Sequence, residues 1–140
     1  LSLTQFAAAM WNKAPAMIGA MRERKIPVAQ LQAEEMADIV AYLYSVQYFA
    51  EPGNQQKGRA LLTDKGCLKC HSLEGKGGKV ATDFAQVKGF DSPATVISAL
   101  WKNAFVMGPL AERKKFEWPQ FTPEEMSDLV TFLQTQGRGQ

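Results

Sequence analysis

The sequence has very little of the chemistry that metal sites and nucleophilic catalysis use, with one histidine and two cysteines in 140 residues. A structural zinc site needs about four nitrogen or sulfur ligands, so three candidates argue against one. No apolar run approaches the roughly 18 residues of a membrane-spanning helix, which argues against a transmembrane segment. A net charge of +2 and the lack of a long basic tract argue against nucleic-acid binding.

Strand signals are equally scarce, because alternating β-branched runs are absent while apolar residues recur at three- and four-residue spacings. The pattern predicts helices over residues 4–13, 33–49, 57–65 and 92–103, and a final helix after residue 122. The segment between residues 74 and 91 is rich in glycine and predicts a loop. The fold class is therefore all-α.

Two helix starts carry capping residues. Ser92 precedes Pro93, which suits a first helical position, and the segment TPEE from Thr122 to Glu125 has the form of a capping box. Residues 51–56, EPGNQQ, have turn composition and predict a linker between residues 1–50 and a domain over 57–140.

The chain starts without an initiator methionine and without the basic n-region and cleavage site of a signal peptide. We therefore expect a processed product or part of a longer polypeptide.

Both cysteines and the histidine fall within five positions, in the segment CLKCH of residues 67–71. A zinc site would need more ligands, and a thioredoxin-like dithiol would need a βαβ context. Covalent haem attachment needs only these positions: Cys67 and Cys70 each add across one vinyl group of the porphyrin, and His71 gives the iron an axial imidazole. The motif therefore predicts a covalent haem c.

Around this motif the chain resembles a class I cytochrome c, over about residues 55–136. Gly58 and Leu62 precede the motif, and the segment DLVTFL of residues 128–133 lies in the final helix. The resemblance implies the class I cytochrome c fold around one covalent haem, with these two helices crossing near Gly58. Many relatives continue with Gly-Pro-x-Leu, whose proline carbonyl orients the imidazole. Here the segment is VATDF, so the sequence does not define that carbonyl.

A shift of ninety residues aligns the chain with itself without a gap. Between residues 9–43 and 99–133, 12 of 35 positions are identical, including Trp11 with Trp101. An internal repeat is the simplest account. It predicts that residues 1–50 are the C-terminal half of a first cytochrome-c-like repeat, whose CxxCH is not in this chain.

Two origins of this half-repeat are open. The parent is a tandem dihaem cytochrome with a second haem c attached outside this segment, or the first repeat has lost its haem-attaching half. The large apolar face that a half-domain would expose favours the tandem origin.

The sixth ligand of the iron must come from another residue type, because His71 is the only histidine. The resemblance implies a methionine from the stretch before the last helix. Met107 is the first choice, since it precedes that helix and is matched by Met17 in the repeat. Met126 is the second choice, although its spacing fits the core, and Met17 would serve a first-repeat haem. Lysine ligation or an open position is also possible.

Trp101 and Trp118 fit packing positions, but in some relatives a tryptophan N–H contacts a haem propionate. Both are therefore candidate cofactor contacts, together with Leu62. Seven basic and three acidic residues lie between 57 and 88. This local charge of +4 is either a solvated surface or a docking ring for an acidic redox partner.

These features predict an electron-transfer c-type cytochrome rather than an enzyme, because two axial ligands leave no substrate position on the iron. The alternatives are a five-coordinate haem sensor or peroxidase-like subunit, and a cytochrome subunit of a larger respiratory complex. In the last case residues 1–50 would contact another cytochrome subunit. The resemblance implies a bacterial periplasmic location or the extracytoplasmic membrane surface.

Overall fold

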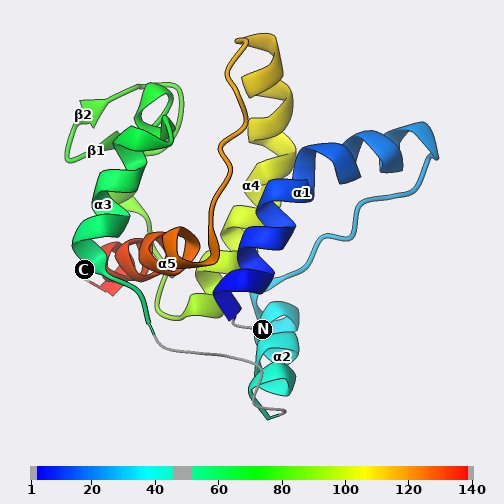
Figure 1. The fold of residues 1–140 in the computed structure, drawn as a ribbon, viewed down its shortest axis with the longest axis horizontal. Helices are drawn as coiled ribbons and strands as arrows, with labels where there is room; N and C mark the ends of the chain where they lie inside the picture. Colours follow the sequence, from blue (N-terminus) through cyan, green and yellow to red (C-terminus); the bar gives the residue numbers. More distant parts are fainter. Residues whose placement is uncertain (1–2, 46–51, 139–140) are drawn as a thin grey trace.

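Helices form most of the structure, a computed structural model that describes residues 3–45 and 52–138 (Figure 1). Within these residues there are five α-helices: α1 (Leu3–Glu23), α2 (Ala33–Ser45), α3 (Gln55–Asp64), α4 (Pro93–Arg113) and α5 (Pro123–Arg138). Between α3 and α4 lie two 3₁₀ turns, η1 (Cys67–Lys69) and η2 (Phe84–Gln86), and an antiparallel pair of two-residue strands, β1 (Ser72–Leu73) and β2 (Lys76–Gly77). The predicted all-α class is confirmed.

The helix starts predicted at Ser92 and Thr122 are confirmed by reciprocal caps. The Ser92 side chain accepts a hydrogen bond from the N–H of Thr95 at 3.2 Å, and the Thr95 hydroxyl accepts one from the N–H of Ser92. The Glu125 carboxylate accepts from the N–H of Thr122 at 2.9 Å, and the Thr122 hydroxyl accepts from the N–H of Glu125 at 3.1 Å. Each pair satisfies two donors that a helix start leaves unpaired.

Two helices run further than predicted, because they continue through prolines. α1 passes Pro15 and ends at Glu23, and α4 passes Pro109 and ends at Arg113. An interior proline costs about 3 kcal/mol. In α1 this cost is offset by packing on both sides of the proline, where Ala14 and Ile18 are buried.

Two residues after the end of each long helix, a lysine adopts the left-handed backbone conformation. Lys25 has φ 53° and Lys115 has φ 56°. The next residue, Ile26 or Phe116, donates its N–H to the carbonyl five residues back, at 2.9 and 2.8 Å. This is the Schellman motif, in which glycine is the usual left-handed residue. Lysine gives no such signal, so the sequence did not locate these ends.

The helix predicted over residues 57–65 begins two residues earlier, inside the segment 51–56 that was predicted as a linker. α2 ends at Ser45, and residues 46–51 lie outside the described part of the chain. Asn54 accepts a hydrogen bond from the N–H of Lys57 at 2.9 Å, and α3 begins directly after it. Asn54 is therefore a helix cap.

α3 crosses α5 at very short range, on the left of Figure 1. At the crossing, a Cβ on Gly58 would overlap the carbonyl of Asp128 and the Cβ of Phe132. Leu62, one turn later, is fully buried, and Phe132 is 1% exposed. Glycine therefore permits the helix crossing that the resemblance implied.

α1 and α4 pack against each other at the centre of the molecule (Figure 1). α1 also packs on α5, and α4 also packs on α2. Trp11 on α1 donates its Nε1–H to the carbonyl of Pro119 at 2.9 Å. Trp101 on α4 donates its Nε1–H to the carbonyl of Ala29 at 3.3 Å. The two donors are ninety residues apart in sequence, and so are the two acceptors. The first half of the chain, which contains α1 and α2, and the second half, which contains α4 and α5, are therefore joined by the same hydrogen bond made twice.

We predict that Gly58→Ala lowers the free energy of unfolding by about 1–3 kcal/mol, because overpacking forces the two helices apart. Gly19→Ala is the matched control, since a Cβ on Gly19 in α1 meets no heavy atom within 4 Å. Alanine favours a helix by about 1 kcal/mol over glycine, so the control is expected to be neutral or stabilising. Urea unfolding measures the free energy of unfolding of both variants. Equal losses of stability in the two would contradict the close crossing at Gly58.

Candidate functional site

The chain leaves α3 in a tight turn that brings the predicted site residues together. Gly66 has φ 75°, the left-handed conformation expected of a glycine after a helix. The N–H groups of Cys70 and His71 both bond to the carbonyl of Cys67, at 3.3 and 3.0 Å. Cys67, Cys70 and His71 therefore lie on η1 and the residues directly after it.

Both cysteines are partly buried free thiols. Burial raises the pKa of the Cys67 thiol to about 11, so this thiol stays protonated at neutral pH. The thiolate is the form that exchanges into disulfides, and burial therefore disfavours oxidation of Cys67. Both sulfurs remain available for a thioether bond, in which S–H adds across a carbon–carbon double bond and no oxidant is consumed.

The His71 ring is fixed by a hydrogen bond and by a ring contact. Its Nδ1 lies 2.8 Å from the carbonyl oxygen of Thr82. A carbonyl only accepts, so Nδ1 carries a proton, and in the neutral ring Nε2 then has the free lone pair. The ring stacks on Phe84, with centroids 4.6 Å apart and planes at 23°. Thr82 thus supplies the carbonyl that the sequence left undefined.

Asp83 holds the loop that carries Thr82 and Phe84. Its carboxylate accepts hydrogen bonds from the Ser72 hydroxyl at 2.8 Å and from three backbone N–H groups, those of Glu74 (3.1 Å), Gly75 (2.7 Å) and Ala85 (2.8 Å). The bonds from Gly75 and Ala85 are the largest causes that hold the pKa of Asp83 below its usual value. Asp83 was not among the predicted site residues, and its only signal in the sequence is an aspartate directly before η2.

The same loop closes over the motif through two glycines. Gly77 has φ 125°, and a Cβ on it would overlap the carbonyl of His71. A Cβ on Gly78 would overlap the backbone of Lys69 and Cys70. The N–H of Gly78 donates to the carbonyl of His71 at 2.7 Å. The backbone around His71 is therefore held from both sides.

Residues 114–121, which lead from α4 to α5, are held against the motif by two lysines. Lys65 donates to the carbonyl of Gln120 at 2.8 Å, and its Nζ also lies 2.8 Å from the Glu125 carboxylate. The Nζ of Lys69 lies 5.0 Å from the ring centroid of Phe116. Together with the hydrogen bond from Trp11 on α1 to Pro119, these contacts place the segment between the motif and α1.

The indole N–H groups of the two tryptophans predicted as cofactor contacts donate hydrogen bonds to backbone carbonyls in the first half of the chain. Trp118 donates to the carbonyl of Trp11 at 3.1 Å and stacks on its ring, with centroids 4.7 Å apart. Trp101 donates to Ala29, as described above. Both therefore hold the two halves together, and a propionate contact by either indole stays a prediction.

Met107 lies inside α4, not between helices where it was predicted, because α4 continues through Pro109. Its side chain is partly buried and packs against the core. Met126 is fully buried in the core, as its spacing indicated. Met17 is partly buried on α1. The structure thus groups the CxxCH residues on one turn and places Met107 on a separate helix.

The donor set fits covalent haem attachment better than the alternatives. It consists of two thiols and one imidazole, fewer than a structural zinc site needs. In residues 3–45 and 52–138, no three His, Cys, Asp or Glu side chains are grouped to hold a metal ion. A haem c requires two free sulfurs and an imidazole nitrogen with a lone pair. Cys67, Cys70 and Nε2 of His71 meet these requirements.

We predict that Asp83→Asn destabilises the protein at neutral pH and weakens the acid dependence of its stability. A carboxyl whose folded-state pKa is lowered stabilises the fold above its ordinary pKa, and the stabilisation is lost as the pH falls through the folded-state value. Urea unfolding at several pH values between about 2 and 7 measures the effect. Asp64→Asn, at an exposed carboxylate on α3, is the control. An unchanged pH profile in Asp83→Asn would show that the carboxylate does not hold the loop.

A family model described as Cytochrome c matches residues 55–137, more than half of the chain. Among curated proteins and among solved structures there is no match. The matched span runs from the start of α3 through the motif and its loop to α5, and so contains the helix crossing and all three residues of the haem-attachment motif, Cys67, Cys70 and His71. The chain belongs to the cytochrome c family, and Cys67, Cys70 and His71 are the residues through which it holds its haem c.

Proposed function

We propose that this cytochrome c is a one-electron carrier in which His71 and Met107 are the axial ligands. The haem supplies an iron that alternates between Fe(II) and Fe(III). The observation that carries the proposal is the hydrogen bond from Nδ1–H of His71 to the carbonyl of Thr82. It supports ligation through Nε2, because a partner on one ring nitrogen sets the tautomer and leaves the other free for a metal.

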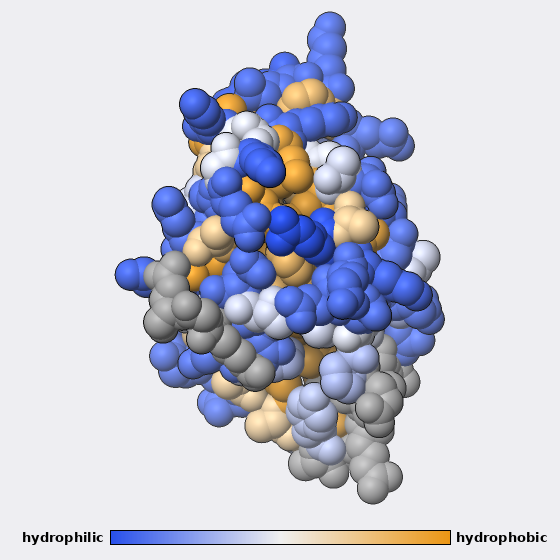
Figure 2. Space-filling model, turned by 90° about the vertical axis from the view of Figure 1, so that its left-hand side faces the viewer, coloured by the Kyte–Doolittle hydropathy of each residue, from blue (hydrophilic) through white to orange (hydrophobic). Residues whose placement is uncertain are grey.

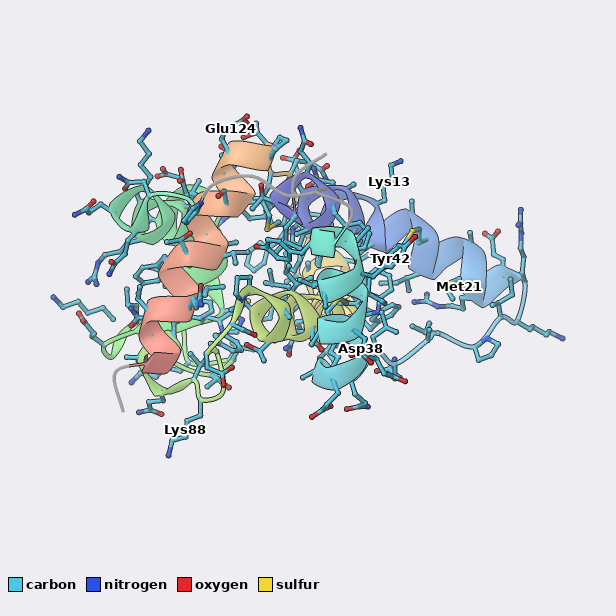
Figure 3. The ribbon with its side chains drawn as sticks, turned by 90° about the horizontal axis from the view of Figure 1, so that it is seen from below. Lys13, Met21, Asp38, Tyr42, Lys88 and Glu124 are labelled. Carbon is cyan, nitrogen blue, oxygen red and sulfur yellow. The ribbon has the colours of Figure 1, made fainter. Side chains whose placement is uncertain are left out.

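The other five methionines are poorly placed to share the iron with His71. Met36 and Met126 are fully buried in the core, and Met10 lines a small cavity between α1 and α4. Met17 and Met21 belong to the C-terminal half of α1, which extends away from the α3–η1 unit (Figures 1 and 3).

Met107 is better placed, because it lies on the C-terminal half of α4. A Cβ on its neighbour Gly108 would lie 3.9 Å from the ring of Trp118. Trp118 belongs to the segment that Lys65 and Lys69 hold against the motif. This shared segment supports Met107 as the second ligand.

The surface around the motif supports docking of an acidic redox partner. Arg59 is paired with Glu74 at 3.1 Å, and Lys65 with Glu125. Four other lysines are exposed and form no ion pair with any described residue: Lys57, Lys76, Lys79 and Lys88. Figure 2 shows this side of the molecule, where hydrophilic side chains surround a strip of apolar ones. A local excess of positive charge speeds encounter with an acidic protein.

We place the protein outside the cytoplasm, in the bacterial periplasm or at the outer surface of the membrane. This location is supported by the covalent haem, because bacteria attach haem c to proteins outside the cytoplasm. In the described part of the chain, no helix combines the length and the apolar content needed to cross a bilayer.

We predict that Met107→Leu abolishes the far-red charge-transfer absorption of ferric Met-ligated haem and opens the iron to carbon monoxide. Loss of the thioether should also lower the reduction potential. Met126→Leu is the control, since a volume-conserving change in the core costs less than about 1.5 kcal/mol and should leave the spectrum unchanged.

The opposite result, with the band lost only in Met126→Leu, would reverse the ligand assignment. If the unaltered protein lacks the band and binds carbon monoxide at once, its haem is five-coordinate. That outcome would favour a gas sensor or a peroxidase-like subunit.

We predict that Lys76→Glu combined with Lys79→Glu slows reduction of the haem by an acidic redox protein several-fold at low ionic strength. The difference should disappear as added salt screens the charges. Lys13→Glu is the control, because Lys13 is exposed on α1 (Figure 3). Equal rates for all three proteins at low salt would contradict docking on this surface.

A further inference from the structure

The α1–α2 and α4–α5 pairs have the same local structure at an offset of ninety residues. α1 and α4 each contain 21 residues, and their bounds differ by ninety at both ends. The N–H of Gln32 bonds to the Glu35 carboxylate at 2.8 Å, as that of Thr122 bonds to Glu125 at 2.9 Å. The left-handed lysines after α1 and α4 obey the same offset. Equivalent positions of α2 and α5 can therefore be compared one by one.

The comparison shows one face that is buried on α5 and exposed on α2. Leu129 is 3% exposed and its counterpart Ile39 is 37% exposed. Phe132 is 1% exposed and its counterpart Tyr42 is 67% exposed. On the adjoining face, toward the long helices, Val130 and its counterpart Val40 are both buried. The difference is therefore confined to one side of the helix, which we call the α2 face: Asp38, Ile39 and Tyr42.

On α5, this side is covered by α3. The closest approach is between Gly58 and residues Asp128 and Phe132, the counterparts of Asp38 and Tyr42. The carboxylate of Asp128 also accepts a hydrogen bond from the N–H of Asn54 at 2.5 Å. In the described residues, α2 packs mainly on α4, and α3 lies beside α5 instead (Figure 3). Among the described helices, none packs on the α2 face as α3 packs on the equivalent face of α5.

We propose that the α2 face binds a second helix of the α3 type, which carries a second CxxCH motif and precedes residue 1 in the natural polypeptide. Asp38 and Tyr42 occupy the positions that receive α3 on α5, and the intervening Ala41 is small enough for close approach. The glycine of the incoming helix would meet the carbonyl of Asp38. A second copy of this chain is a poorer occupant, because its own α3 is already packed on its own α5.

The proposal gives Met17 the role in a first haem site that Met107 has in the second. Both lie on the C-terminal half of their long helix, and both are partly buried. The two sites would be joined by the pair of tryptophan contacts between the halves. The proposal does not depend on which methionine serves the haem of His71.

The first test is the number of haems in the natural polypeptide. Pyridine haemochrome absorbance divided by protein concentration, with the intact mass of the denatured chain, is expected to give two covalent haems per polypeptide. A value of one would overturn the proposal. This count is independent of Met107, so it separates failure here from failure of the proposed ligation.

The second test measures the α2 face by hydrogen exchange in the natural holoprotein. Amides of residues 39–43 should exchange as slowly as those of residues 129–133, and at least about tenfold more slowly than in a chain trimmed to residues 1–140. Tyr42→Asp should remove this protection, whereas Tyr44→Asp, two positions away on the same helix, should keep it. Two haems with a fast-exchanging α2, or protection that survives Tyr42→Asp, would show that the second haem-carrying segment binds elsewhere.

Discussion

The hydrogen bond between Nδ1 of His71 and the carbonyl of Thr82 is the constraint on which the haem site depends, because it decides which imidazole nitrogen faces a metal. A single bond to a loop would fix little if the loop could move. Here the neighbouring Asp83 gathers four donors, and the Phe84 ring stacks on the imidazole. A short irregular segment therefore orients the ligand through several contacts at once.

The helices hold in place both this loop and residues 114–121, the segment between α4 and α5. α3 delivers the motif and is pressed onto α5 at Gly58, so the position of the motif follows from a helix crossing that only glycine permits. The segment between α4 and α5 is fixed from two directions. Lys65 bonds to it from the motif side, while Asn12 forms a pair of 2.8 Å hydrogen bonds with the backbone of Phe121 from α1. The first half of the chain is thus part of the support of the haem site.

The sequence predicted those parts of the molecule that short-range chemistry determines. The CLKCH motif and the caps at Ser92 and Thr122 are contiguous, so their residues alone define them. The helix ends predicted at residues 13 and 103 were wrong, because both helices continue through a proline and the left-handed residue that follows each of them is a lysine instead of the usual glycine. The acceptor for His71 is a backbone carbonyl, which no residue type reveals. The partner of Trp118 lies 107 residues away, beyond any local pattern.

The central claim is that Cys67 and Cys70 hold the haem covalently beside His71. Its most direct test is acidified-solvent extraction of the purified protein, followed by the pyridine haemochrome spectrum of each phase. The account predicts that the haem stays with the polypeptide and that its reduced α-band lies where two thioether-substituted side chains place it. Haem released into the solvent, with the spectrum of unmodified haem b, would contradict the account.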